Sequence, residues 1–200
     1  AAILTPMFGG AMMHAPFLGE ALCRAHNDWI QKEWLDKDDR LRASIAVAAQ
    51  APELAAEEID RRASDKRFVQ VLLLAANEML LGRRYYWPIY EAARRHGLPV
   101  GIHAGSMYRY PTTPSGWPPH YLHDYAAVPN HFQAQLQSLL SEGTFSKFED
   151  LTFVLIESGV SWLPPYLWRA TKTWRGVRQE VPWLDRKPSE IIDGRVFLSL

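Results

Sequence analysis

His103 and Glu157 are the two side chains of this 200-residue sequence whose positions most favour chemistry. Each follows a short apolar run directly, Val100–Ile102 for the histidine and Phe153–Ile156 for the glutamate. An imidazole can bind a divalent metal ion or carry a proton. A carboxylate at the end of an apolar run is expected to be paired, bound to a metal or raised in pKa. The two residues therefore predict metal binding or proton transfer.

Both residues also have an ordinary structural interpretation. His103 could donate a hydrogen bond to a loop carbonyl, and Glu157 could form a salt bridge, for which Arg169 is a candidate partner. The position at the end of an apolar run favours function, whereas the isolation of His103 from other ligand types in the sequence favours structure. The residues alone leave the two interpretations open.

Six apolar segments alternate with helical patterns along the chain. These predicted strands begin near residues 3, 43, 69, 99, 152 and 195. Near-continuous apolar strands joined by helices are typical of a parallel sheet that is covered on both faces, so the sequence predicts an α/β fold. Reactive groups in such folds lie at the carboxyl ends of the strands. That rule selects His103 and Glu157, together with Asn77 and Glu78.

Helices with a buried apolar face are predicted between these strands, and three of them are defined here by their inward residues. The residues expected to face inward are Leu18, Ala21, Leu22, Ala25 and Trp29 in the first, Phe132, Leu136, Leu139 and Leu140 in the second, and Leu163, Leu167, Ala170, Trp174 and Val177 in the third. Asn130 is expected to cap the second helix. A long connection over 104–129, with five prolines and with His120 and His123, is typical of a functional loop or a lid.

Six strands fit either a doubly wound sheet or part of a closed (β/α)₈ barrel, which needs eight strands and about 250 residues. No G-x-G-x-x-G pattern follows any predicted strand, so Rossmann-type dinucleotide binding is disfavoured. The sequence begins and ends on apolar, strand-like runs. We therefore treat residues 1–200 as a single domain that looks truncated at both ends, with further strands expected outside it.

Composition disfavours several classes of function. The sequence has 22 basic and 22 acidic residues, and no basic run is longer than a pair, so neither nucleic acid nor an anionic membrane is an expected partner. No apolar stretch approaches the roughly 18 to 20 residues that span a bilayer. The single cysteine, Cys23, cannot form an internal disulfide, which favours a cytoplasmic location. A small-molecule substrate is the expected partner, and a homo-oligomer stays open.

Three longer segments resemble one known family. They are IYEAARRHGLPVGIHAG (89–105), FVLIESGVSWLPPYLWR (153–169) and EVPWLDRKPSE (180–190). They are similar to the amidohydrolase-related family of metal-dependent (β/α)₈ barrels, which includes aminocarboxymuconate-semialdehyde decarboxylase. The resemblance runs through essentially the whole chain. It implies a (β/α)₈ TIM barrel of which this chain covers about six strands.

The resemblance also implies roles for individual residues. His103 matches a histidine that binds the metal at the end of the fifth barrel strand, and the implied metal is zinc, with manganese as the alternative. Glu157 stands where better-known members carry a histidine, and we assign it the catalytic proton transfer. Arg169 and Trp162 follow as candidates for substrate binding. The family's H-x-H pair and its last-strand aspartate have no counterpart within residues 1–200.

The function implied by the resemblance is hydrolysis of an ester, lactone or amide by a metal-activated water. Non-oxidative decarboxylation of an aromatic or muconate-type acid is the first alternative, because the family performs both reactions on the same scaffold. A catalytically degenerate binding protein is the second alternative.

Overall fold

The computed structural model describes residues 1–6, 10–105 and 109–200. They pack as two units, Ala1–Leu73 with Tyr85–Gly101 and Leu74–Arg84 with Ile102–Leu200. Each unit is described by itself below. Part of the predicted loop over 104–129, residues 106–108, lies outside the described residues.

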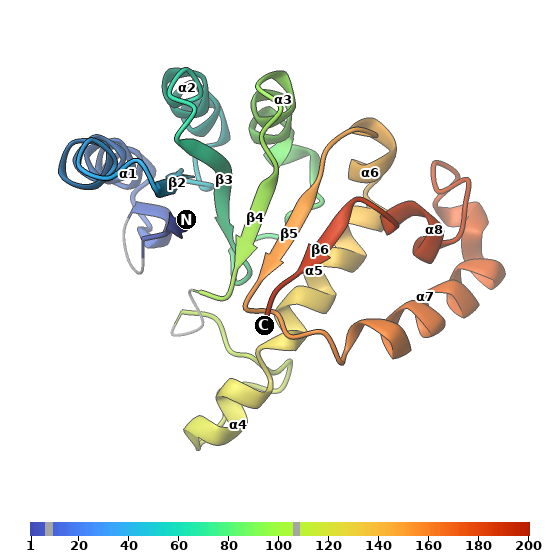
Figure 1. The fold of residues 1–200 in the computed structure, drawn as a ribbon. Coiled ribbons are helices and arrows are strands. Elements are labelled where there is room, and N and C mark those ends of the chain that lie inside the picture. Colours follow the sequence, from blue (N-terminus) through green and yellow to red (C-terminus); the bar gives the residue numbers. More distant parts are fainter. Residues whose placement is uncertain (7–9, 106–108) are drawn as a thin grey trace. The chain divides into compact units, whose positions relative to one another are not determined.

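The first unit is built on parallel strands with helical connections (Figure 1). Its strands are β1 (Ala2–Leu4), β2 (Leu41–Ala46) and β3 (Phe68–Leu74), whose last residue belongs to the second unit. Its helices are α1 (Pro16–Ile30), α2 (Pro52–Arg62) and α3 (Trp87–Arg95). β1 pairs with β2, and β2 with β3, in parallel register. Helices α2 and α3 lie side by side in both ribbon views.

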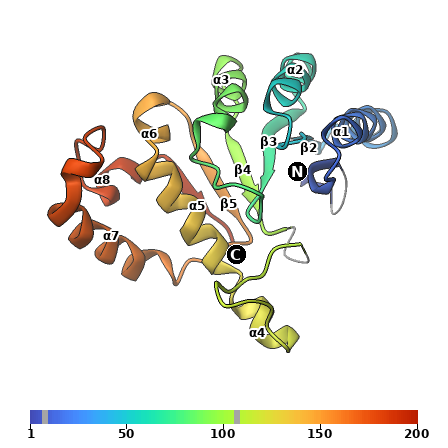
Figure 2. The same cartoon turned by 180° about the vertical axis from the view of Figure 1, so that it is seen from behind.

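The second unit carries the last two strands and most of the remaining helices. Its strands are the end of β4 (Val100–His103), β5 (Phe153–Ile156) and β6 (Val196–Leu198). Its helices are α4 (Tyr121–Ala126), α5 (Pro129–Ser141), α6 (Thr144–Lys147), α7 (Leu163–Val177) and α8 (Pro188–Ile192). β5 and β6 are parallel, and the strand order follows the chain, β1-β2-β3-β4-β5-β6. Figure 2 shows α5 over one face of β5 and β6.

The alternation of strands and helices confirms the predicted α/β fold class. Each of the six predicted strands is present, with starts that differ by one or two residues from the expected positions. Among the described residues, no helix is long and apolar enough to cross a membrane.

The predicted buried face of α1 is wrong. Leu18, Leu22 and Trp29 are between 41% and 52% exposed, and the helix instead buries Gly19, Cys23, Asn27 and Ile30. Two interactions set this rotation. The Asn27 side chain donates to the carbonyl of Ala46 (2.9 Å) and accepts from its N–H (3.0 Å), which fixes the helix on β2. At Gly19, a Cβ would lie 2.7 Å from the carbonyl oxygen of Gly10, so only glycine permits this approach.

The predicted buried face is confirmed for α5 and wrong for α7. Phe132, Leu136, Leu139 and Leu140 of α5 are all buried, as predicted. In α7, by contrast, no residue is buried. The predicted cap on α5 is also wrong, because Val128 occupies the N-cap position and the Asn130 amide donates to the Thr112 carbonyl (3.0 Å).

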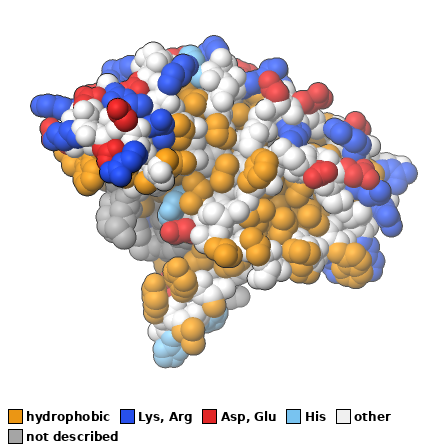
Figure 3. Space-filling model, in the orientation of Figure 1, with side chains coloured by type: hydrophobic (Ala, Val, Ile, Leu, Met, Phe, Trp, Pro, Cys, Tyr) orange, Lys and Arg blue, Asp and Glu red, His pale blue; other side chains and the backbone are white. Residues whose placement is uncertain are grey.

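Helix α4 is a short element that the sequence pattern did not reveal. It has no buried residue, and Tyr121, Leu122 and Tyr125 are 77%, 83% and 64% exposed. Figure 3 shows hydrophobic side chains on the surface of the α4 region, together with histidine. Without a buried face there is no apolar periodicity to detect, which is why the helix was missed.

Buried polar side chains of α5 and α6 fix the segment that follows β3. Gln135 accepts a hydrogen bond from the Leu81 N–H (2.7 Å) and donates to the Ala75 carbonyl (2.7 Å). Ser138 accepts from the Gly82 N–H (3.1 Å), and Thr144 donates to the Gly82 carbonyl (2.9 Å). Since backbone groups buried without partners are costly, these contacts determine the path of residues 75–82.

Replacing Gln135 tests whether its side chain holds the segment 75–82 in place. Gln135→Leu keeps the volume but leaves the Leu81 N–H and the Ala75 carbonyl buried without their partner, so we expect a loss of about 2 to 5 kcal/mol in the free energy of unfolding. Gln137→Leu, on the same helix, removes only exposed hydrogen bonds and should cost less than about 1 kcal/mol. Chemical denaturation of both variants measures the difference, and equal stabilities would contradict the proposed attachment.

Candidate active site

Backbone hydrogen bonds in the second unit align the carboxyl ends of neighbouring strands. The Ala75 N–H donates to the His103 carbonyl (2.8 Å), and the Ala104 N–H donates to the Ile156 carbonyl (3.2 Å). The residues that follow β4 and β5 are therefore neighbours. This brings His103 and Glu157 together at one sheet edge, as the strand-end rule predicts.

The His103 ring has a defined orientation. Its Nδ1 lies 2.6 Å from the carbonyl oxygen of Ala104. A carbonyl can only accept, so Nδ1 carries a proton, and in the neutral imidazole Nε2 presents a lone pair. The His103 side chain is 24% exposed, so part of the side chain is reachable from solvent. This is the arrangement in which a histidine serves as a metal ligand or proton acceptor, because the hydrogen bond at one nitrogen sets the role of the other.

Glu157 faces this nitrogen from the adjacent strand end. Its Oε2 lies 3.8 Å from His103 Nε2, too far for a direct hydrogen bond. Its side chain is 57% exposed, so the carboxylate is not buried at the end of its strand. No ion pair among the described residues joins it to Arg169, the partner considered in the structural interpretation.

The backbone of Glu157 is strained. Its φ is +58°, and it is the non-glycine residue with a positive φ among those described. The left-handed region costs a non-glycine residue roughly 1 to 2 kcal/mol. The Glu157 N–H donates to Ser199 Oγ (3.0 Å), and the Ser199 N–H donates to the Leu155 carbonyl (3.0 Å), which holds this turn in place. Strain of this kind is common where a side chain is held for function.

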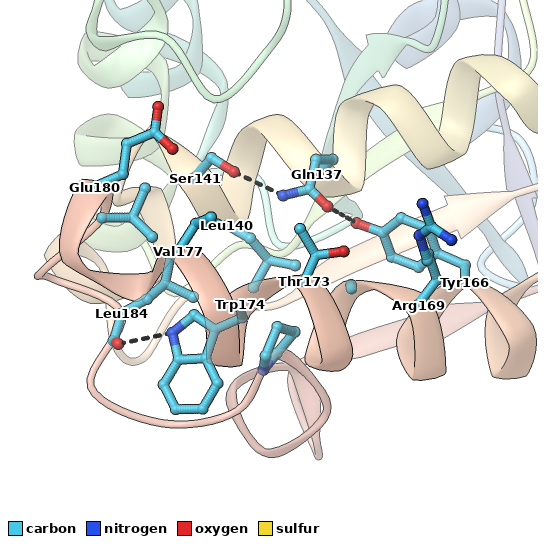
Figure 4. A pocket seen from close by; sticks show the side chains of 13 residues that line it. Gln137, Leu140, Ser141, Tyr166, Arg169, Thr173, Trp174, Val177, Glu180 and Leu184 are labelled. Carbon is cyan, nitrogen blue, oxygen red and sulfur yellow. Dashed lines mark hydrogen bonds between the residues drawn. The ribbon is translucent and has the colours of Figure 1, made fainter.

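Arg169 lies on α7 and lines a cavity of about 300 Å³ between α5, α7 and the segment leading to α8 (Figure 4). On one wall the Tyr166 hydroxyl donates to Gln137 Oε1 (2.8 Å), and the Gln137 amide donates to Ser141 Oγ (2.7 Å). Burial raises the pKa of Tyr166, so its hydroxyl stays protonated and able to donate. Three of the α7 residues that were expected in the core, Ala170, Trp174 and Val177, line this cavity instead.

Trp162, the other predicted substrate-binding residue, is 8% exposed at the start of α7. Its Nε1 donates to the carbonyls of Ser158 (2.9 Å) and Gly159 (3.1 Å), and its ring packs edge-on against Tyr166. The indole therefore supports the turn that follows Glu157. Its role in binding substrate stays a prediction, as does that of Arg169.

The sequence analysis selected Glu78 but missed its partner. Arg109 Nη2 lies 3.5 Å from Glu78 Oε1, and the Arg109 side chain is only 12% exposed. Arg109 belongs to the long connection after β4, which has no periodic pattern. The only sequence signal was its place six residues beyond His103.

The donor set at this edge fits a divalent cation in part. His103 Nε2 and Glu157 Oε2 are a nitrogen and an oxygen donor of the kinds that zinc and manganese accept. Within the described ranges there is no group of three or more His, Cys, Asp or Glu side chains that could hold a metal ion. A cation bound here would therefore find at most two of its protein ligands among the described residues, and other groups would have to fill its remaining positions.

Three solved structures share the fold. A 5-carboxyvanillate decarboxylase from Sphingomonas paucimobilis is 24% identical with a TM-score of 0.75, and the match covers 98% of this chain and 58% of that one. An amidohydrolase from Mycobacterium avium subsp. paratuberculosis is 23% identical with a TM-score of 0.76, covering 93% and 50%. A dihydroxybenzoic acid decarboxylase from Polaromonas, with bound manganese and the inhibitor 2-nitroresorcinol, is 22% identical with a TM-score of 0.72, covering 94% and 59%.

The chain thus spans between 50% and 59% of the length of these three proteins. No curated protein sequence matches it. The structural likeness confirms the predicted (β/α)₈ barrel fold, of which this chain contributes six strands. The amidohydrolase family model matches residues 5–197, and the chain therefore belongs to the amidohydrolase family.

Proposed function

We propose that the protein is a metal-dependent carboxy-lyase that removes CO₂ from a small aromatic acid, using His103 and Glu157. The observation that carries this proposal is their geometry. A histidine with its proton fixed on Nδ1 presents Nε2 to an exposed carboxylate 3.8 Å away, and the backbone of that carboxylate is held in a strained conformation.

In this proposal His103 helps to hold the cation, which when bound supplies the positive charge that attracts the substrate carboxylate, and Glu157 stays free to carry a proton. The hydrogen bond from Nδ1 to Ala104 orients the ring and keeps Nε2 available. Manganese is the favoured ion, because the Polaromonas relative contains it, and zinc is the alternative that the sequence analysis favoured.

Loss of CO₂ leaves a carbon that must receive a proton. A carboxyl group that is reachable from solvent can collect a proton and deliver it, and the Glu157 side chain is 57% exposed. A group that acts in this way must be mobile at its tip and fixed at its backbone. The Ser199 hydroxyl supplies the fixed point by accepting from the Glu157 N–H.

Hydrolysis, the function that the sequence analysis placed first, becomes the second candidate. It is favoured by the family description and by the amidohydrolase among the similar structures. Decarboxylation now ranks higher because two of the three similar structures are decarboxylases of hydroxylated aromatic acids. A binding protein without activity is the third candidate.

Turnover by the full-length protein distinguishes these candidates. After incubation with manganese or zinc, we expect CO₂ release from carboxyvanillate- or dihydroxybenzoate-type acids and no hydrolysis of a panel of lactones, esters and amides. Release of CO₂ can be followed by a coupled assay and product identity by chromatography. Hydrolysis alone would restore the second candidate, and no turnover with either metal would favour the third.

Removing the imidazole tests the metal assignment. His103→Ala should strip most of the bound metal from the full-length protein, since a site loses affinity steeply when one of three or four ligands is removed. His123→Ala, in the exposed helix α4, is the matched control and should keep the wild-type content. Elemental analysis after gel filtration gives the stoichiometry, and a full complement of metal in His103→Ala would show that the assignment is wrong.

We expect the Glu157 side chain to transfer a proton in the reaction. We expect its left-handed backbone to lower the free energy of unfolding. Glu157→Gln keeps the volume but cannot move protons, so activity should fall by about 10² to 10⁴ while stability changes by less than about 0.5 kcal/mol. Glu157→Gly removes the left-handed strain, but glycine also makes the unfolded chain more flexible, so it should be unchanged or up to about 1 kcal/mol more stable.

Thermal unfolding and turnover of both variants are measured beside Glu142→Gln, a control at an exposed position in the second unit. If Glu157 belonged to a buried structural pair, Glu157→Gln would lose roughly 3 to 5 kcal/mol. That loss together with normal turnover would exclude the catalytic role.

A further inference from the structure

Arg109 brings a shielded positive charge to the second unit. Its side chain is 12% exposed, and its contacts include a carboxylate and an aromatic ring. The Glu78 carboxylate is 3.5 Å from Nη2, and the centre of the Tyr110 ring is 5.3 Å from the guanidinium carbon. Arginine remains charged at any physiological pH, and a charge shielded from water interacts more strongly with an incoming ion than an exposed one.

Backbone pairing places this charge in the loops beside His103. The Ala76 N–H donates to the Gly105 carbonyl (3.3 Å), one hydrogen bond beyond the Ala75–His103 contact. The chain reaches Glu78 two residues after Ala76, and the Arg109 guanidinium lies against the Glu78 carboxylate. Glu78 and Arg109 therefore emerge from the same strand ends that carry the candidate active site.

The charges at this edge determine what it can attract. Four ionisable groups follow these strand ends. Glu78 and Glu157 are carboxylates, His103 is an imidazole, and Arg109 is the permanent cation. Two carboxylates alone would repel a carboxylic acid substrate. A guanidinium with parallel N–H donors matches a carboxylate in geometry as well as in charge.

We propose that Arg109 is the residue that recognises the substrate carboxylate, and that Glu78 is a positioning residue that orients its guanidinium. The inference rests on the proposed function, because it assumes an acidic substrate. Arg109 binds and orients the acid through charge-assisted hydrogen bonds, and it transfers no proton. Glu78 acts only through Arg109.

Binding to the full-length, metal-loaded protein tests this inference independently of turnover. The probes are 2,6-dihydroxybenzoate and its uncharged amide, and calorimetry gives both affinities. The wild type should prefer the acid. Arg109→Met should weaken acid binding by about 10- to 100-fold and leave amide binding unchanged, so that the preference disappears.

Two further variants separate recognition from folding. Arg109→Lys keeps the charge without the planar fork and should retain part of the preference, which covers the case that Arg109→Met does not fold. Glu78→Gln should raise KM for the acid with little change in kcat, whereas a merely structural role would lower stability without changing the acid-to-amide ratio. Arg186→Met is the matched control, because Arg186 forms a comparable ion pair with Asp185 at 3.3 Å on an exposed segment.

The outcomes distinguish this inference from the proposed function. If the wild type decarboxylates the acid and Arg109→Met keeps the wild-type preference, the role of Arg109 is wrong and the proposed function stands. If the wild type neither binds nor decarboxylates any acid tested, both are overturned. Loss of the preference in Arg109→Met but not in Arg186→Met supports the assignment.

Discussion

The hydrogen bonds between the carboxyl ends of the strands are the constraint on which the candidate active site depends. The Ala75–His103 and Ala104–Ile156 contacts fix where each strand stops relative to its neighbour. The relative alignment of β4 and β5 brings the side chains of His103 and Glu157 together, and no direct bond between the two side chains is needed. This explains how His103 and Glu157 can lie 3.8 Å apart without a direct bond between them. A site of this kind keeps its geometry while its groups change protonation or exchange a ligand.

The backbone around the candidate site is fixed by hydrogen bonds, whereas the Glu157 carboxylate is exposed to solvent. The buried amide of Gln135 joins the segment after β3 to helix α5, and the Ser199 hydroxyl fixes the backbone of Glu157. Above these supports the Glu157 carboxylate is more than half exposed. The strain at its φ of +58° is therefore borne by backbone contacts that do not limit the reach of the side chain. The backbone atoms of Glu157 thus carry the strain, while its carboxylate is exposed to solvent.

Much of the fold could be predicted from the sequence, because apolar periodicity reports burial directly. The strands and the buried face of α5 follow that rule. It failed on α1, where a buried polar residue, Asn27, and the close approach at Gly19 decide which face turns inward. For the site, the strand-end rule selected His103 and Glu157 but could not show the strained backbone or the exposure of the carboxylate. Arg109 was missed because its environment is created by residues distant in sequence.

The contact between Glu157 and Ser199 joins residues that are 42 positions apart. During synthesis the ribosome releases the chain from its N-terminus, so β4 and β5 emerge well before the serine that secures the turn. Until Ser199 arrives, the Glu157 turn lacks the contact that offsets its left-handed backbone, and other conformations of this turn are favoured. The order of emergence therefore makes the Glu157 turn one of the last parts of the second unit to reach its final geometry.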